Sequence, residues 1–225
     1  MTPAAASVEI LAAGTELLTG EVRDSNARFL ARAATERGAV VTRALLLPDD
    51  PAALAAAIRE SLGRAPRVLF TCGGLGPTGD DLTLAAVAAA AGVPLEEHPA
   101  ARAMVEAGYA ALAARGWVGD AAPTPERLKM ALLPRGARPL ANPVGAAPGV
   151  LLPLGATTVI SLPGVPAELE AIVAGPLRPE LAALLGDGAF AEDSVVVLTG
   201  DESALAPAVA GASRGFPAVR VKSRA

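Results

Sequence analysis

The residues best suited to chemistry lie in one stretch, residues 70–83, with the sequence FTCGGLGPTGDDLT. Its glycines let backbone N–H groups approach an anion closely, and the helix expected to follow adds a partial positive charge at its first turn. Asp80 and Asp81 would repel a bare phosphate at that position. A divalent cation between carboxylate and phosphate would remove this conflict. The stretch therefore predicts a phosphate-binding loop that works together with a metal ion.

Other interpretations of this stretch compete with phosphate binding. Gly74, Gly76 and Gly79 fit the G-x-G-x-x-G pattern of dinucleotide-binding turns, but no clear second strand ending in an acid follows about 20 residues later. A P-loop is excluded, because no Lys-Ser or Lys-Thr pair follows the last glycine. A tight turn with an Asp helix cap needs only one Asp and does not need Gly73 or Gly76. We therefore favour phosphate binding over a purely structural turn.

A second polar turn, residues 14–26 with the sequence GTELLTGEVRDSN, follows the strand expected at residues 8–14. Asp24 is a good N-cap residue for the helix expected at residues 27–37, so capping and catalysis fit it about equally well. Glu16 stands close to a glycine, and we slightly favour a functional role for it over simple exposure to solvent. The turn offers two further acids to a metal site.

Strands and helices alternate through the first part of the chain. Apolar runs and helical patterns predict strands at residues 8–14, 39–47 and 67–70, and helices at residues 27–37, 52–62 and 82–91. We expect Asp49 and Asp50 to have a capping role at the second helix. This alternation predicts a parallel sheet between helical layers, whose ligands bind beyond the carboxyl ends of the strands. Both polar turns would lie at that edge, where acids far apart in sequence could meet.

The next part of the chain adds two loops rich in Gly and Pro, at residues 141–149 and 163–168. They adjoin strands expected at residues 150–152 and 157–162. Gly and Pro commonly make hairpins and turns, which is the simpler explanation. Two such loops in one domain nevertheless favour backbone groups that line a pocket.

Other residues of this region carry weaker signals. His98, the only histidine, is expected to be a surface residue at the start of a helix over residues 100–115. Tyr109 and Trp117 are expected to pack against neighbouring side chains. Lys129 lies on a short helix and either reaches a phosphate or is simply solvated.

The pattern changes again after residue 176. We expect residues 1–176 to form the ligand-binding domain and residues 177–225 to form a small, truncated α+β appendage. The appendage would contain helices at residues 177–185 and 201–209 and strands at residues 194–199 and 217–222.

The composition limits the classes of function. The chain has 225 residues, of which 52% are apolar and only 3% aromatic, and its net charge is −4. No block of Lys and Arg appears, so a nucleic acid is not an expected partner. A single cysteine excludes a disulfide framework. No apolar run approaches the roughly 20 residues of a membrane span, and no basic region opens a signal peptide, so we expect a cytoplasmic protein.

Four motifs follow one another along the chain: GTELLTG with DSN at residues 14–26, GGLGPTGDDLT at 73–83, NPVGAAPG at 142–149 and LPGVPAE at 162–168. Together they resemble the N-terminal domain of the competence/damage-inducible protein A (CinA-like) family, in the MoaB/Mog-like molybdopterin-binding superfamily. The resemblance covers residues 8–222 and is to a stand-alone form without the family's amidase domain. Many bacterial members have NRKQAxxP where this chain has RLKMALLP, which keeps Lys129.

The resemblance implies a three-layer α-β-α sandwich of the MoaB/Mog molybdopterin-binding type with a mainly parallel sheet. It implies binding of a nucleotide or pterin phosphate and metal-dependent hydrolysis of a nucleoside-diphosphate-linked compound, with ADP-ribose as the leading candidate. The alternatives are molybdopterin binding or adenylyl transfer in molybdenum cofactor biosynthesis, and a non-catalytic binding module. By analogy with the family, we expect a homo-oligomer, either a dimer or a trimer.

Carried over to this sequence, the family motifs assign Asp24 and Asp81 as catalytic residues. A divalent metal ion, Mg²⁺, Mn²⁺ or Co²⁺, would be held by Glu16, Asp24, Asp80 and Asp81. The residues expected to bind phosphate or the rest of the substrate are Thr71, Gly73, Gly74, Gly76, Pro77, Thr78, Lys129, Asn142, Gly145, Pro148, Gly149, Gly164 and Glu168.

Overall fold

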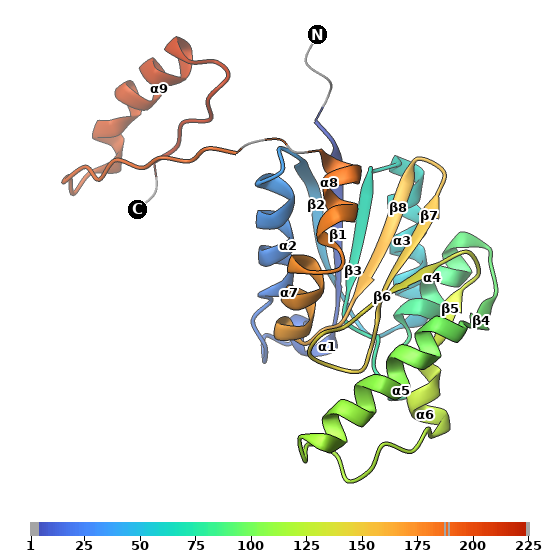
Figure 1. Ribbon diagram of the computed structural model, residues 1–225. Helices are drawn as coiled ribbons and strands as arrows, with labels where there is room; N and C mark the ends of the chain where they lie inside the picture. The colour runs from blue at the N-terminus through green and yellow to red at the C-terminus, as the bar shows by residue number, and fades with distance from the viewer. Residues whose placement is uncertain (1–4, 187, 189, 224–225) are drawn as a thin grey trace. The chain divides into compact units, whose positions relative to one another are not determined.

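The protein is described by a computed structural model that covers residues 5–186, 188 and 190–223. Contacts divide the chain into two compact units, one up to Phe190 and the other from Ala191 onward. The first unit contains the sheet and all four motifs (Figure 1).

A six-stranded sheet forms the centre of the first unit, in the order β2-β1-β3-β8-β7-β6 (Figure 1). The strands are β1 (Ser7–Ala13), β2 (Val40–Leu47), β3 (Val68–Cys72), β6 (Arg138–Leu140), β7 (Gly149–Leu154) and β8 (Thr157–Leu162). β2, β1, β3 and β8 run parallel, whereas β7 is antiparallel to both β8 and β6. β3 and β8 are buried along their whole length, as expected for central strands covered on both faces. The predicted mainly parallel sheet is confirmed.

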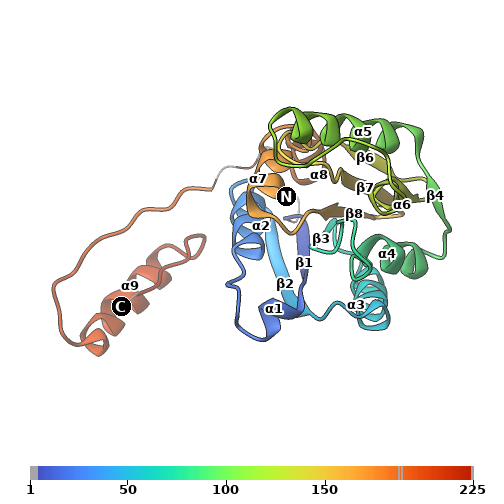
Figure 2. The ribbon, with the colours of Figure 1, turned by 90° about the horizontal axis from the view of Figure 1, so that it is seen from below.

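Helices cover both faces of the sheet, which confirms the three-layer sandwich (Figure 2). On one face pack α2 (Asn26–Thr35), α7 (Pro166–Ala174) and α8 (Arg178–Leu185), and on the other α3 (Pro51–Arg64), α4 (Thr83–Ala91) and α5 (Pro99–Ala114). Alternate residues of a strand point to opposite faces. Ile10 and Ala12 therefore pack on the face covered by α2, while Leu11 and Ala13 pack on the face covered by α3.

Between α4 and β6, the two helices expected from the sequence are joined by a two-stranded sheet that the sequence patterns did not predict. β4 (Leu95–Glu97) pairs antiparallel with β5 (Leu132–Pro134), and α6 (Pro125–Lys129) lies between α5 and β5 in the chain. Strands of three residues are too short to show a periodic pattern. His98 caps α5, because its Nδ1 accepts from the Ala101 amide at 3.4 Å, as expected for a residue at a helix start. The packing role expected for Trp117 is wrong, since Trp117 is 66% exposed.

α8 packs into the first unit, although sequence analysis assigned its residues to the appendage. Leu177, Leu181 and Leu185 are buried in the same core cluster as α2 and α7. Their spacing of four residues places them on one face of the helix.

The second unit contains a 3₁₀ turn, Glu202–Leu205, followed by α9 (Ala206–Gly215). The strands predicted at residues 194–199 and 217–222 are wrong, because the described part of this unit contains no strand. Val195, Val196 and Leu198 are instead 87%, 87% and 98% exposed. The apolar, β-branched composition predicted a strand, but a strand also needs a partner for its ladder of hydrogen bonds.

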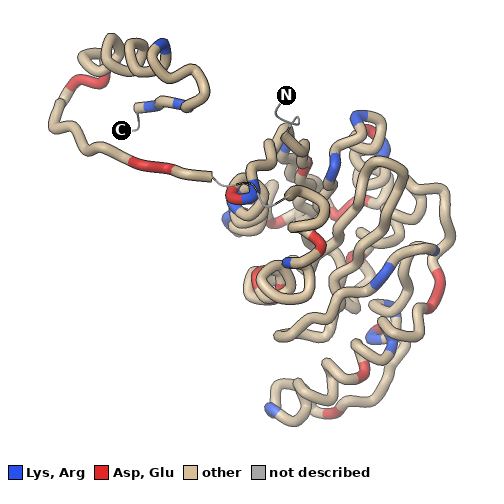
Figure 3. The backbone as a smooth tube through the Cα atoms, turned by 45° about the horizontal axis from the view of Figure 1, so that its top comes forward, with Lys and Arg blue, Asp and Glu red and all other residues tan. Residues whose placement is uncertain are grey.

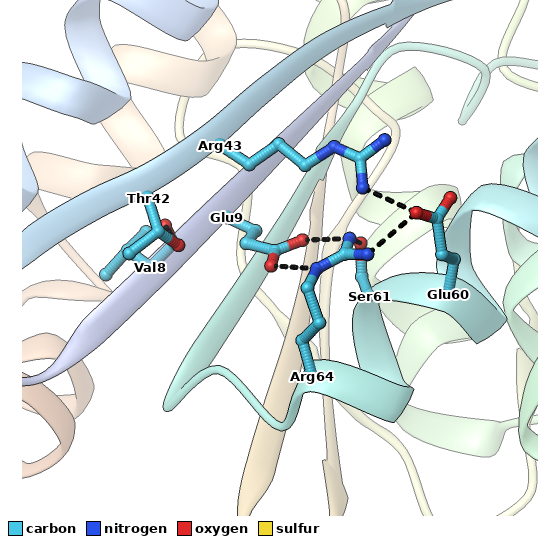
Figure 4. A network of polar contacts seen from close by, with 7 residues as sticks. All are labelled: Val8, Glu9, Thr42, Arg43, Glu60, Ser61 and Arg64. Carbon is cyan, nitrogen blue, oxygen red and sulfur yellow. Dashed lines mark hydrogen bonds and ion pairs between the residues drawn. The ribbon is translucent and has the colours of Figure 1, made fainter.

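A buried ion pair joins α3 to the beginning of β1 (Figure 4). Glu9 is 2% exposed, and Arg64 donates to both of its carboxylate oxygens, from Nε at 2.7 Å and from Nη2 at 2.8 Å. Arg64 and Arg43 also each donate to Glu60 at 2.8 Å. The hydrogen bonds from Arg64 hold the pKa of Glu9 below its ordinary value. Because this network lies where the strand begins, at the opposite edge from the polar turns, we assign it a structural role.

Charged residues of both signs are spread along the chain (Figure 3). This distribution agrees with the absence of a block of Lys and Arg from the sequence. None of the helices in the described ranges is long and apolar enough to cross a membrane.

Candidate functional site

All four motifs meet at one edge of the sheet, where β1, β3 and β8 end (Figure 1). β1 leads into α1 (Thr15–Leu18), and β3 leads into the glycine-rich loop, residues 73–82. Leu140 at the end of β6 pairs with Gly149 at the start of β7, so the loop between them lies at the same edge. The fold therefore brings together residues that lie far apart in the sequence, as the strand alternation predicted.

The glycine-rich loop begins with two residues that only glycine adopts readily. Gly73 and Gly74 have φ angles of +95° and +66°. A Cβ on Gly73 would lie 2.1 Å from the carbonyl oxygen of Ala13, and the Gly73 amide donates to Leu162 at 3.1 Å. A Cβ on Gly164 would likewise lie 3.3 Å from the Gly73 Cα. The loop thus passes tightly between the ends of β1 and β8.

Thr83 holds the two ends of this loop together, a role that sequence analysis did not assign. Its hydroxyl donates to the carbonyl of Gly73 at 2.8 Å, and its amide donates to the carbonyl of Gly74 at 3.2 Å. Thr83 is fully buried and is the first residue of α4. The amides of Gly74, Leu75 and Gly76 donate to no acceptor among the described residues. These free donors near a helix start are suited to phosphate oxygens.

The two acids of the loop are engaged with Thr78. Its amide donates to Asp81 Oδ2 at 2.8 Å, and its hydroxyl lies 2.6 Å from the same oxygen and 2.5 Å from Asp80 Oδ1. The hydroxyl holds the pKa of Asp80 below its ordinary value. A Cβ on Gly76 would lie 2.6 Å from Asp81 Oδ2. Asp81 therefore shapes the loop from within, which sequence spacing did not reveal.

Lys129 comes to the same loop from α6. Its ammonium group donates to the carbonyl oxygen of Thr78. Arg127 points elsewhere, because its guanidinium lies 4.1 Å from the centroid of the Tyr109 ring and pairs with Asp120. Of the two basic residues on this helix, only Lys129 contacts the glycine-rich loop.

Glu16 and Asp24 line one pocket of about 80 Å³, together with Cys72 and Gly164. Asp24 Oδ1 accepts from the Ala27 amide at 2.9 Å, so this carboxylate caps α2. Within the described residues, its Oδ2 and both carboxylate oxygens of Glu16 accept no hydrogen bond. Burial and the charge of Asp24 raise the pKa of the Cys72 thiol to about 12. The pocket thus offers carboxylate oxygens to a cation, whereas the neighbouring thiol stays protonated.

Two contacts that sequence analysis did not foresee tie the second polar turn to other segments of the chain. Asn26 donates from Nδ2 to the carbonyl of Gly164 at 2.7 Å and ties the second polar turn to the loop after β8. Asp49 Oδ2 accepts from the amide and the hydroxyl of Thr15, at 2.8 and 3.0 Å. Asp50 caps α3 as expected, but Asp49 does not and instead anchors the start of α1.

Asn142 and Glu168 organise the loop between β6 and β7. Asn142 Oδ1 accepts from the amides of Val144 and Gly145, at 3.0 and 2.9 Å, and its Nδ2 donates to Glu168 at 2.5 Å. A Cβ on Gly145 would lie 2.3 Å from the carboxyl carbon of Glu168. Burial raises the pKa of Glu168, against the opposing effect of Asn142. These side chains shape the loop through contacts with each other.

Three residues expected at the site are built into the sheet. Thr71 is 2% exposed, and its hydroxyl donates to Ser161 Oγ at 2.8 Å, which links β3 to β8. Pro148 and Gly149 are buried at the start of β7. These positions give the three residues structural roles, and the site proposed below does not include them.

The four acids expected to bind a metal divide into two pairs. Glu16 and Asp24 line the pocket, while Asp80 and Asp81 are engaged within the loop. Among residues 5–186, 188 and 190–223, no three Asp, Glu, His or Cys side chains come together as a metal site. Two carboxylates with free oxygens fit the way Mg²⁺ is commonly bound, through one or two carboxylates plus phosphate oxygens of the substrate.

Comparisons with known proteins agree with this architecture. Residues 9–183 match a family model described as a probable molybdopterin binding domain. A protein of Aeropyrum pernix is 45% identical over 214 residues, which cover 95% of this chain and 77% of that protein. A protein of Pyrococcus abyssi is 39% identical over 215 residues, which cover 96% of this chain and 83% of that protein.

Solved structures show the same fold. The protein CinA of unknown function from Thermoplasma acidophilum matches with a TM-score of 0.71 at 36% identity, over 79% of this chain and 98% of that chain. The tungsten cofactor synthesizing protein MoaB from Pyrococcus furiosus matches with a TM-score of 0.51 at 14% identity, over 82% of this chain and 97% of that chain. At this lower identity the likeness concerns the fold alone.

Proposed function

Because this chain belongs to the MoaB/Mog-like family of molybdopterin-binding domains, we propose that it binds a nucleoside-diphosphate-linked compound and hydrolyses its diphosphate. ADP-ribose is the leading candidate for this substrate. One observation carries the proposal: Glu16 and Asp24, from separate parts of one turn, line a pocket that also includes Cys72, the residue before the glycine-rich loop. The proposed cation site thus adjoins backbone donors suited to phosphate.

The residues of the site have distinct roles in this proposal. The amides of Gly74 and Gly76 donate to phosphate oxygens and stabilise the negative charge that builds on them. Lys129, already in contact with the loop, adds a positive charge beside it. Asp80 and Asp81 keep the loop in shape through Thr78.

Glu16 and Asp24 supply the negative charge that a divalent cation requires. A cation bound there would polarise the phosphoryl group and lower the pKa of a bound water. The free oxygen of Asp24 also provides an acceptor that can orient this water toward phosphorus.

The proposal is tested by following release of AMP from ADP-ribose with Mg²⁺, Mn²⁺ or Co²⁺, and with a chelator. We expect metal-dependent AMP release that falls about 100-fold or more in Asp24→Asn. Asn is itself a good helix cap, so this change removes the charge and keeps the cap. Asp50→Asn is the matched control, since Asp50 caps α3 in the same way outside the pocket. Equal activity of Asp24→Asn and wild type would refute the assigned role.

The match of residues 9–183 to a family described as a probable molybdopterin binding domain supports a second candidate, adenylyl transfer to molybdopterin or molybdopterin binding alone. Both would use the same phosphate loop. Absence of AMP with every metal, together with retained ligand binding, would favour this second candidate over hydrolysis.

A further inference from the structure

The second polar turn, which carries the two proposed metal ligands, is held to the rest of the protein by few contacts. Within residues 15–23 only Leu17 is partly buried, and the others are exposed. At its start the turn is held by Asp49, which binds Thr15. At its end it is held by Asn26. A segment with so little buried surface depends on its few fixed points for its position.

The side-chain amide of Asn26 makes the contact at the end of the turn. Its Nδ2 donates to the carbonyl oxygen of Gly164 at 2.7 Å, across 138 positions of the sequence. In the described part of the chain, no other side chain of this turn forms a hydrogen bond with the loop after β8. Asn26 and Gly164 both line the pocket of Glu16 and Asp24. The bond therefore joins two segments that line this pocket.

Gly164 in turn lies against the glycine-rich loop. A Cβ on Gly164 would lie 3.3 Å from the Cα of Gly73, and the Gly73 amide donates to a carbonyl at the end of β8 at 3.1 Å. From Gly73 the chain continues into Gly74 and Gly76, whose amides are the proposed phosphate donors. Asn26 is thus linked, through Gly164, to the place where the glycine-rich loop begins.

The start of α2 does not require the side-chain amide of Asn26. Asn26 is the first residue of the helix, and Ser25 occupies the N-cap position. The carboxylate of Asp24 accepts from the Ala27 amide at 2.9 Å and so already caps the helix. Because the Asn26 amide binds another segment, its loss should change the spacing between segments more than the helix itself.

This spacing matters because the two parts of the proposed site come from different segments. The carboxylates belong to the second polar turn, whereas the phosphate donors belong to the glycine-rich loop. Mg²⁺ requires oxygen ligands in near-octahedral geometry at about 2.0–2.1 Å. A cation can therefore bridge carboxylate and phosphate only when the two segments are held at a matching distance. A contact that links the segments makes the binding of one ligand depend on the other.

We propose that Asn26 is a positioning residue, which couples cation binding at Glu16 and Asp24 to phosphate binding at the glycine-rich loop. Asn26 acts through the carbonyl of Gly164. This inference rests on the proposed function, because it requires a cation and a diphosphate to bind side by side. It gives a role to a residue that supplies neither a charge nor a phosphate donor.

Calorimetry of inorganic pyrophosphate binding to the full-length chain, with Mg²⁺ and with a chelator, measures this coupling. The ratio of the two affinities is the enhancement due to the cation. Complexes of Mg²⁺ with pyrophosphate in free solution are the same for every variant, so their effect cancels when the ratios of two variants are compared. Asn26→Ala removes the amide. Thr19→Val is the matched control, because the Thr19 hydroxyl donates to the Glu16 carbonyl at 3.2 Å within the same turn.

We expect Mg²⁺ to strengthen binding of pyrophosphate to wild type about tenfold or more, and Asn26→Ala to lower this enhancement about fivefold or more. The affinity of Asn26→Ala in the chelator should equal that of Thr19→Val. A residue with a purely structural role would instead weaken both affinities alike and leave their ratio unchanged. If Asn26→Ala does not fold, Asn26→Ser allows the same measurement, since Ser is favoured at helix starts but is too short to reach Gly164.

An enhancement in Asn26→Ala equal to that in Thr19→Val would overturn the inference and leave the proposed function intact. A parallel loss of both affinities would also overturn it, by showing a purely structural role. Wild type that binds pyrophosphate equally well with Mg²⁺ and with the chelator would overturn the inference together with the cation site of the proposed function.

Discussion

Replacing Gly73 by Ala tests how the glycine-rich loop is held between β1 and β8. The φ angle of Gly73 is +95°, and forcing an L-residue into the positive-φ region costs about 1–2 kcal/mol. The new Cβ would lie 2.1 Å from the carbonyl oxygen of Ala13, whereas ordinary contacts begin at 3.4 Å. The loop must therefore move, which strains the 3.1 Å hydrogen bond to Leu162, worth about 1 kcal/mol.

These contributions give a destabilisation of about 2–3 kcal/mol for Gly73→Ala. For a chain of this size, this corresponds to a decrease in Tm of about 5–10 °C. Because the same movement displaces the amides of Gly74 and Gly76, binding of pyrophosphate should weaken as well.

Thermal unfolding followed by circular dichroism, with calorimetry for pyrophosphate, would measure both effects. Gly79→Ala is the matched control in the same loop, because no atom lies within 4 Å of its added Cβ and its φ is not positive. We expect Gly79→Ala to stay within about 0.5 kcal/mol of wild type. If Gly73→Ala unfolds at the same temperature as Gly79→Ala and binds pyrophosphate equally well, the explanation from the close contact is refuted.

Two further predictions concern Glu9, which is buried, and Glu168, which is half-buried. Arg64→Ala leaves Glu9 buried without its partner and should lower the free energy of unfolding, measured in urea, by about 2–3 kcal/mol. The loss is smaller than for a fully buried pair because Arg64 is 37% exposed. The control, Arg43→Ala, loses only its bond to exposed Glu60 and should cost less than about 1 kcal/mol. Because burial raises the pKa of Glu168, folding favours the protonated form of this side chain. The protonated carboxyl therefore makes its full contribution to stability below the ordinary pKa of 4.5, and this contribution is lost as pH rises through the raised pKa. Glu168→Gln should therefore be more stable than wild type at about pH 7 and should lose this advantage at about pH 4, and an advantage independent of pH would contradict the assigned desolvation.

Much of the fold follows from local patterns in the sequence. Short runs rich in apolar and β-branched residues predicted β3 and β8, because central parallel strands are buried on both faces. Asp50 predicted the start of α3, since a cap acts within its own turn. Gly92, with a φ of +69°, ends α4 as predicted. In each case the deciding interaction lies within a few residues along the chain.

The order of the motifs also predicted that distant turns meet at one edge, because parallel strands end on the same side of a sheet. Glu16, Asp24 and the glycine-rich loop are found there. The spacing could not show which acids are free, since this depends on neighbouring donors in three dimensions. Thr78 engages Asp81, whereas no described residue donates to the carboxylate oxygens of Glu16.

What the sequence determined by itself is therefore most elements of the first unit, the edge at which they end and the chemical types gathered there. Only the tertiary structure decided that Thr71 faces Ser161, that Asp49 anchors Thr15 and that Asn26 reaches the carbonyl of Gly164. It also corrected the strands expected at residues 194–199 and 217–222. The physical reason is common to these cases: a strand, a buried hydroxyl or a side-chain amide depends on a partner that lies far away in the sequence, and local propensity carries no information about that partner.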